Sequence, residues 1–283
     1  MRSKVHIFML LLCSLVLFSC QPVDLDKELR LGIAAAKNND WEKALAKAEL
    51  CLDNVPSSAD AAILKSLSLF LLHYNNAEDV EKALELIRQV TKEHPDRYDA
   101  FLVHGWILMN KNRLDEAIMP LKRAYELQLD PSNKNVTQVV QGTINYALGI
   151  TYLRNNIFED AEKHLLTAIK STPYNEWYSI YASLGVIAYN RGQYRKALDY
   201  MVKARELAPK DEYAIAVNIA VLMDYLSYRK FNPSNPKVYA AQRQNWYRYA
   251  LNCVLMARNS SINLKEQRYL DELAKSIRKR ARI

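Results

Sequence analysis

The chain has 283 residues, of which half are hydrophobic and a quarter are charged, and its formal net charge is +8. That length is enough to bury a large apolar surface, while a total of 6 glycines leaves little for the loops of cofactor sites. Among the 4 cysteines, Cys51 and Cys253 lie near opposite ends of the part that we expect to fold, so we expect no disulfide between them.

The first residues have the pattern of an export signal. Two basic residues precede an apolar run over residues 7–18, which is too short to span a bilayer comfortably. The run ends in Leu17-Phe18-Ser19-Cys20, which resembles a bacterial lipobox: an aliphatic residue, a spacer, a small residue and a cysteine.

This resemblance implies that residues 1–19 are removed as a signal peptide and that Cys20 carries acyl chains, palmitate included. Residues 20–24 would then form a lipidated tether. Gln21 follows in place of Asp, which implies the periplasmic face of the outer membrane if sorting follows the enterobacterial pattern. An ordinary signal peptide, or an uncleaved anchor with a cysteine present by chance, is the alternative.

Residues 25–131 carry three copies of a pattern in which two amphipathic helices follow one another. Apolar residues recur at intervals of three and four, which indicates one buried face on each helix. A small residue occupies the same slot of each first helix, at Gly32, Ser66 and Gly105. A proline follows each second helix, at Pro56, Pro95 and Pro131. In the second copy we expect a longer turn, over residues 74–79.

The two copies that follow match each other position by position. The segment Asn145-Tyr-Ala-Leu-Gly149 returns 36 residues later as Tyr181-Ala-Ser-Leu-Gly185. The glycine of each first helix and an alanine of each second helix should let the two backbones approach closely. Asparagine and glycine predict the turns between the helices, at residues 155–156 and 191–192.

The repeated pattern resembles the tetratricopeptide repeat, a helix-turn-helix unit of nominally 34 residues. The resemblance implies an all-α fold, a right-handed superhelix (solenoid) of about six repeats. Residues 25–209 would form five units, residues 210–258 a degenerate sixth unit, and residues 259–283 a basic capping helix. Cys51 occupies a small-residue slot in the first unit, so we expect it to be buried.

No catalytic or metal-binding pattern occurs in the sequence. The 5 histidines lack metal-ligand spacing, and neither a nucleophile elbow nor a phosphate-binding loop is present. We therefore expect no enzyme activity, no metal and no cofactor. A rival function of another class, a periplasmic enzyme or a small-ligand carrier, would need polar groups that converge on the concave side. The candidates for such groups are Asp99, Arg154, Asn190 and Asp224.

The resemblance also implies that the first helices line a concave groove. The side chains mapped onto this groove are apolar and aromatic: Leu102, Trp106, Met109, Tyr146, Ile150, Leu153, Val186 and Tyr189. Such a surface predicts a partner protein of the cell envelope, bound as a helix or an extended segment. The alternative is that the chain's own C-terminal helices fill the groove. The residues named for chaperone binding in this family, Lys and Asn in these slots, are absent.

The last part of the chain is strongly basic. From Ser227 onward there are 13 Lys and Arg residues against 3 acidic residues, which leaves the preceding part close to neutral. The expected basic surface comprises Arg243, Arg248, Lys275, Arg278, Lys279, Arg280 and Arg282. Export makes nucleic acid an unsuitable ligand, so we expect anionic lipid headgroups or an acidic partner. A solvated basic cap is the alternative.

Together these patterns predict a lipid-anchored scaffold or adaptor that takes part in the assembly of a cell-envelope complex. Lipoproteins of this general build include the type IV pilus pilotins, which help an outer-membrane secretin to assemble. A pilotin-like role is therefore the nearest specific function that the resemblance implies.

Overall fold

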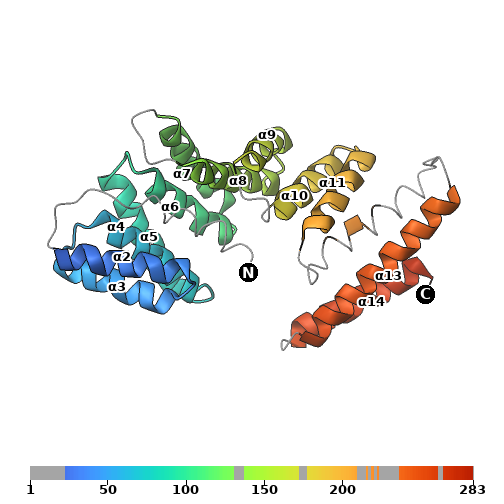
Figure 1. Ribbon diagram of the computed structural model, residues 1–283, viewed down its shortest axis with the longest axis horizontal. Coiled ribbons are helices and arrows are strands. Elements are labelled where there is room, and N and C mark those ends of the chain that lie inside the picture. The colour runs from blue at the N-terminus through green and yellow to red at the C-terminus, as the bar shows by residue number, and fades with distance from the viewer. Residues whose placement is uncertain are drawn as a thin grey trace. The chain divides into compact units, whose positions relative to one another are not determined.

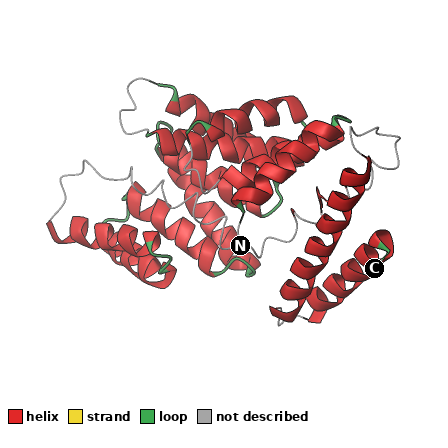
Figure 2. Ribbon diagram, turned by 45° about the vertical axis from the view of Figure 1, so that its right-hand side comes forward, coloured by secondary structure: helices red, strands yellow, loops and turns green. Residues whose placement is uncertain are grey.

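The structure, a computed structural model, describes residues 23–130, 137–171, 177–208, 236–260 and 264–282, together with Ile215, Asn218, Ile219 and Leu222. Every regular element in these ranges is an α-helix (Figure 2), so the predicted all-α class is confirmed. No helix in the described part of the chain is long and apolar enough to cross a membrane. The predicted signal peptide and Cys20 lie outside the described residues.

The chain divides into two compact units, Met1–Pro173 and Tyr174–Ile283. The helices of the first unit form consecutive pairs (Figure 1). These pairs are α2 (Val23–Lys37) with α3 (Trp41–Asn54), α4 (Ala59–Leu72) with α5 (Ala77–Glu93), α6 (Tyr98–Asn110) with α7 (Leu114–Gln128), and α8 (Gln138–Arg154) with α9 (Phe158–Ile169). Helix α4 also contacts α2 and α6, and α6 contacts α8, so successive first helices lie side by side as in a helical solenoid.

The turns that join the two helices of a pair share one backbone conformation. Asn39, Asn112, Asn156 and Gly192 all have positive φ, between 60° and 73°. The N–H of the next residue then donates to a carbonyl five residues earlier, as from Ile157 to Tyr152 at 2.8 Å. This is the Schellman ending of a helix, for which Gly and Asn are suited because they tolerate the left-handed region. The turns predicted at residues 155–156 and 191–192 are confirmed.

The turn of the second pair has another conformation, and the prediction of a longer turn over residues 74–79 is wrong. Helix α5 already begins at Ala77, so the additional residues extend the helix. The physical cause is the side chain of Asn76, which caps the helix by accepting from the N–H groups of Glu78 and Asp79. Two acidic residues in the first turn complement the helix dipole further.

Close approach of the paired helices is visible at the glycine slots. A Cβ added to Gly105 would lie 2.5 Å from Cγ of Leu121, and one added to Gly149 would lie 2.7 Å from Cγ of Leu165. In the same slot, Ser66 is buried and its hydroxyl donates to the carbonyl of Ala83 at 2.7 Å. A glycine, or a serine that satisfies its own hydroxyl, is therefore required where the two backbones meet.

The buried thiol of Cys51 belongs to this packing in the first pair. It is a free cysteine that is 4% exposed, and its Sγ lies 3.6 Å from the carbonyl oxygen of Leu25. Burial raises the pKa of the Cys51 thiol, so the group stays protonated. The expected burial of Cys51 is confirmed.

The second unit contains α10 (Trp177–Asn190), which packs on α11 (Tyr194–Leu207), and α13 (Pro236–Ser260), which packs on α14 (Leu264–Ala281). Ile215 and Ile219 pack against Tyr178, Met201 and Ala204. Trp246 of α13 is partly buried against this cluster and also against the cluster that joins α13 to α14. Most of residues 210–235 lie outside the described part, so the degenerate sixth unit stays a prediction.

Candidate functional site

The eight predicted groove residues lie on α6, α8 and α10, which are first helices of successive pairs. Four of them are buried by the chain itself: Leu102, Trp106, Met109 and Tyr146. The indole of Trp106 is only 3% exposed, on a helix that contacts α4, α7 and α8. These four side chains therefore contribute to packing between helices and present little surface to a ligand.

The other four residues retain accessible surface. Ile150 and Leu153 of α8 are half-buried in the first unit, and Val186 of α10 is half-buried in the second. Tyr189 is 41% exposed, with its ring edge-on to Tyr194 at a centroid distance of 5.6 Å. Among the predicted groove residues of the first unit, those with accessible apolar surface are thus on α8, and their use by a partner stays a prediction.

Asp99, one candidate for a catalytic group, belongs to an ion-pair bridge between first helices. The guanidinium of Arg97 lies 2.6 Å from a carboxylate oxygen of Asp99 on α6 and 2.5 Å from one of Asp60 on α4. Burial lowers the pKa of Arg97, but the hydrogen bond to Asp99 and the two carboxylate charges raise it overall. Asp99 is therefore a structural partner of Arg97.

Arg154, a second candidate for a polar group of an enzyme site, links its own helix pair to the preceding pair through hydrogen bonds. Its guanidinium donates to the carbonyl of Met109 at 2.8 Å and to the side-chain oxygen of Asn112 at 2.7 Å. The preceding pair uses the same arrangement, because Lys111 donates to the carbonyl of Tyr74 at 3.0 Å. A carbonyl in the turn after α4 and one at the C-terminal end of α6 thus accept hydrogen bonds from cations of the following repeat.

The described candidates for an enzyme site do not converge. Asp99 and the carbonyl that Arg154 holds lie ten residues apart along α6, about 15 Å at the helical rise of 1.5 Å per residue. Asn190 donates to the carbonyl of Val186 within its own helix, and Asp224 lies outside the described residues. In the described part of the chain no three His, Cys, Asp or Glu residues form a group that could hold a metal ion.

One buried histidine, His164, and one half-buried histidine, His104, take part in packing. His164 of α9 lies 2.9 Å from the side-chain oxygen of Asn145 on α8 and stacks on Tyr152. Burial lowers the pKa of His164, and nearby lysine charges lower it further. Burial also lowers the pKa of His104 to about 4, so both imidazoles are neutral at pH 7.

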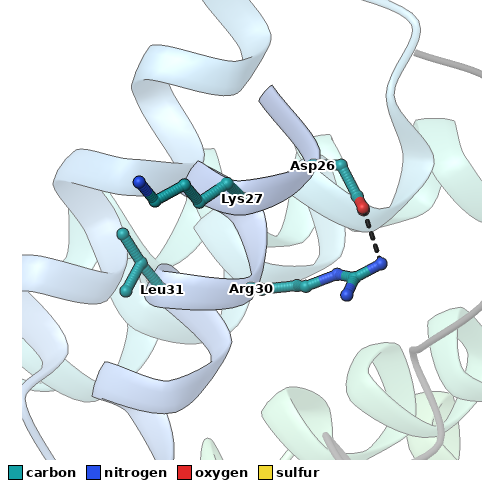
Figure 3. A pocket seen from close by; sticks show the side chains of 4 residues that line it. All are labelled: Asp26, Lys27, Arg30 and Leu31. Atoms are coloured by element: carbon teal, nitrogen blue, oxygen red, sulfur yellow. Dashed lines mark ion pairs between the residues drawn. The ribbon is translucent and has the colours of Figure 1, made fainter. Parts of the chain in front are cut away.

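A shallow pocket lies on α2, lined by Asp26, Lys27, Arg30 and Leu31 (Figure 3). All four residues belong to one helix, and Arg30 pairs with Asp26 at 2.7 Å. Because no second element contributes a group, the pocket offers no set of converging contacts for a ligand.

The predicted basic surface lies on the α13–α14 hairpin. The two helices run antiparallel: Gln244 donates to the carbonyl of Ala281 at 2.8 Å, and Arg258 pairs with Asp271 at 3.1 Å. All seven basic residues therefore lie in the half of the hairpin that contains the start of α13 and the end of α14. Arg243 is half-buried, and the other six are exposed: Arg248, Lys275, Arg278, Lys279, Arg280 and Arg282.

Comparison of the sequence with known families agrees with the helix pairing. Residues 67–134 and 178–211 match the family described as the tetratricopeptide repeat. The chain contains tetratricopeptide repeats. These two segments cover α6 with α7 and α10 with α11, so the predicted repeat architecture is confirmed in both units.

Solved structures of tetratricopeptide proteins share this fold. PilW, a type IV pilus biogenesis factor, superposes with a TM-score of 0.60 at 21% identity, covering 83% of this chain and 100% of that one. PilF of Pseudomonas aeruginosa gives 0.58 at 16% identity, with 88% and 97% covered. Cut9–Hcn1 gives 0.62 at 16% identity, with 96% and 47% covered. At these identities the likeness establishes the tetratricopeptide solenoid fold alone.

One curated relative is a far longer protein. The human Protein O-mannosyl-transferase TMTC3 is 28% identical over 162 residues, which are 56% of this chain and 16% of that protein. The tetratricopeptide chain thus spans less than a fifth of the length of this relative.

Proposed function

We propose that this tetratricopeptide chain is a non-catalytic scaffold of the cell envelope that binds a partner protein along its first helices. The observation that carries the proposal is the side-by-side placement of α4, α6 and α8. Repeats stacked in this way build an extended surface, along which a helix or extended segment of another protein can lie. The accessible apolar side chains of α8, Ile150 and Leu153, are the proposed contacts in the first unit.

The binding part of the proposal is tested by two matched substitutions. Leu153→Glu places a charge on the first helix α8, and Leu166→Glu places one on α9, the second helix of the same pair, where Leu166 is 41% exposed. We expect recovery of the partner on affinity purification to fall about tenfold or more for Leu153→Glu alone, because desolvating a charge opposes binding. Equal recovery with both variants would contradict a binding surface on α8.

The proposed membrane attachment is a lipid on Cys20. It is supported by the sequence Leu17-Phe18-Ser19-Cys20, which lies directly before the first described helix. Mass spectrometry of the mature protein should find acyl chains on Cys20, and Cys20→Ser should move the protein from the membrane fraction to the soluble fraction. A Cys20→Ser variant that remains in the membrane after normal signal removal would exclude the lipid anchor.

A pilotin-like role in type IV pilus biogenesis is the nearest specific form of this proposal. The fold that the chain shares with PilW and PilF supports it. In a host with a pilus secretin, deletion of this protein should lower the amount of assembled secretin in the outer membrane without lowering secretin synthesis. Unchanged secretin assembly would leave the general scaffold function and exclude the pilotin-like one.

A further inference from the structure

The α13–α14 hairpin concentrates its positive charge at one end. This basic end consists of the seven residues of the basic surface and Lys237, which is also exposed. Residues 236–250 and 273–282, which make up this end, contain no Asp or Glu. The acidic residues Asp271 and Glu272 precede this part of α14, and Asp271 pairs with Arg258 at the other end of the hairpin.

The cations of α14 point away from the core of the hairpin. Leu270, Ala274 and Ile277 are buried against Tyr247 and other residues of α13. Because residues at intervals of three and four share a helix face, Lys275, Arg278 and Lys279 form one exposed stripe outside the buried face. The apolar face is therefore already occupied, and the outward face is cationic.

Little of this charge is neutralised within the hairpin. Lys275 pairs with Glu272 at 2.6 Å, with both side chains more than two-thirds exposed. Among the described side chains, no acidic group pairs with Arg248, Arg278 or Lys279. Clustered cations without local counter-ions create a positive potential over the surface, which attracts anions in solution.

We propose that the basic end binds the anionic phosphate headgroups of a bilayer as a second membrane contact. This proposal rests on the proposed membrane anchor, because a tethered protein meets the bilayer at high effective concentration and needs only a weak second contact. Among the side chains described at this end, the exposed large apolar one is Val238. A stable protein interface would instead need a central aromatic or apolar cluster. An outward stripe of cations on a helix matches a planar sheet of phosphates.

The test is lysine footprinting of the full chain with an acylating reagent, read by mass spectrometry. Lys275 and Lys279 report on the basic end, and Lys82 of α5 is the internal control, since it is exposed and ion-paired as Lys275 is. On vesicles of phosphatidylcholine with phosphatidylglycerol, we expect the two hairpin lysines to react several-fold more slowly relative to Lys82. Pure phosphatidylcholine vesicles, or high salt, should abolish this protection. Equal reactivity on both kinds of vesicle would overturn the proposal.

Two charge-reversal variants sharpen the test. Arg278→Glu with Arg282→Glu should remove the protection, whereas Lys122→Glu with Lys163→Glu, an equal charge change at exposed sites of the first unit, should preserve it. Flotation of the Arg278→Glu, Arg282→Glu variant with neutral vesicles tests the lipid anchor separately, because neutral vesicles do not attract the basic end. Protection by soluble glycerol phosphate, by polyglutamate or by DNA at the same ionic strength, with none on anionic vesicles, would assign the site to another anion and overturn the bilayer contact.

Discussion

Single atoms decide how closely the helices of a pair can approach, and the glycine slots differ in how they would tolerate a methyl group. In the first unit the obstacles at Gly105 are Cγ and Cδ2 of Leu121, at 2.5 Å and 2.7 Å, and Leu121 is fully buried, so its side chain has little room to change rotamer. In the second unit the obstacles at Gly185 are Cγ and the terminal methyl of Met201, both at 2.9 Å, so the overlap is smaller than at Gly105. A methionine end can change rotamer, so the same substitution should have different consequences at these sites.

We expect Gly105→Ala to lower the free energy of unfolding by about 1–3 kcal/mol, because overpacking outweighs the helix propensity that alanine gains. Gly185→Ala should change it by less than about 1 kcal/mol, since the propensity gain offsets the movement of Met201. Thermal melting followed by circular dichroism measures both. Equal loss of stability in the two variants would contradict this difference between the obstacles.

Neutral His104 makes stability depend on pH. Burial, with help from the charges of Arg88 and Arg113, lowers its pKa to about 4, against about 6.5 in an unfolded chain. The unfolded state therefore binds more protons between these values, so the contribution is fully present above pH 6.5 and is lost as the pH falls toward 4. His104→Gln should reduce the stability difference between pH 7 and pH 5 by about 2 kcal/mol in denaturant titrations. A variant with the same pH dependence as the parent would show that His104 does not contribute.

At the residue scale, the sequence predicts the packed environment of some residues and not of others. Gly149 and Cys51 were predictable because their slots recur along the chain, and recurrence at helical spacing indicates a shared packed environment. The burial of Trp106 was not predictable in the same way. Its slot defines the direction of the side chain, but the coverage by α4 and α8 depends on how neighbouring pairs stack.

At the scale of elements, cations from one repeat secure the end of a helix in the repeat before. The hydrogen bond from Arg154 to the carbonyl of Met109 joins two residues that are 45 positions apart in the chain. No local sequence pattern predicts a contact at that separation. The cap at Asn76 was missed for another reason: asparagine favours both a turn and a helix N-cap, and only the bonds to Glu78 and Asp79 distinguish them.

Asn190 provides a matched control for the role of Arg154, because it occupies the same slot 36 residues later and, among the described residues, its side chain donates to a carbonyl of its own helix. Arg154→Ala should lower stability by about 1 kcal/mol and speed hydrogen exchange at the C-terminal turn of α6, since charged hydrogen bonds to Met109 and Asn112 are lost. Asn190→Ala should stay within about 0.5 kcal/mol. Similar small effects of both substitutions would show that Arg154 does not secure α6.

Buried and accessible residues among the predicted groove side chains should also respond differently to truncation. Trp106→Ala removes a fully packed indole and should cost about 3–5 kcal/mol in unfolding free energy. Leu153→Ala, at a half-buried site, should cost less than about 2 kcal/mol and act mainly on binding. Melting curves together with partner recovery separate the two roles. A Trp106→Ala protein with unchanged stability and lost binding would make Trp106 a contact residue.

At the scale of the whole molecule, the pairing of helices followed from the sequence, whereas the ligands of the surface did not. The pattern shared by Asn145–Gly149 and Tyr181–Gly185 identifies repeats because each repeat buries its apolar face against the next. A repeat scaffold hosts many functions, so the architecture leaves the partner unspecified. The proposed scaffold combines three separable parts: a lipid at Cys20, the accessible side chains of α8, and the basic end of the α13–α14 hairpin.

The central claim is that a partner protein lies along the first helices. The most direct measurement is photo-crosslinking in the native cell from a probe that replaces Leu153, with a probe at Leu166 as the control, followed by mass spectrometry of the products. The account predicts one dominant envelope protein attached at Leu153 and none in common at Leu166. Crosslinks from Leu153 only to residues of this chain beyond Ser227, or the same products from both probes, would contradict it.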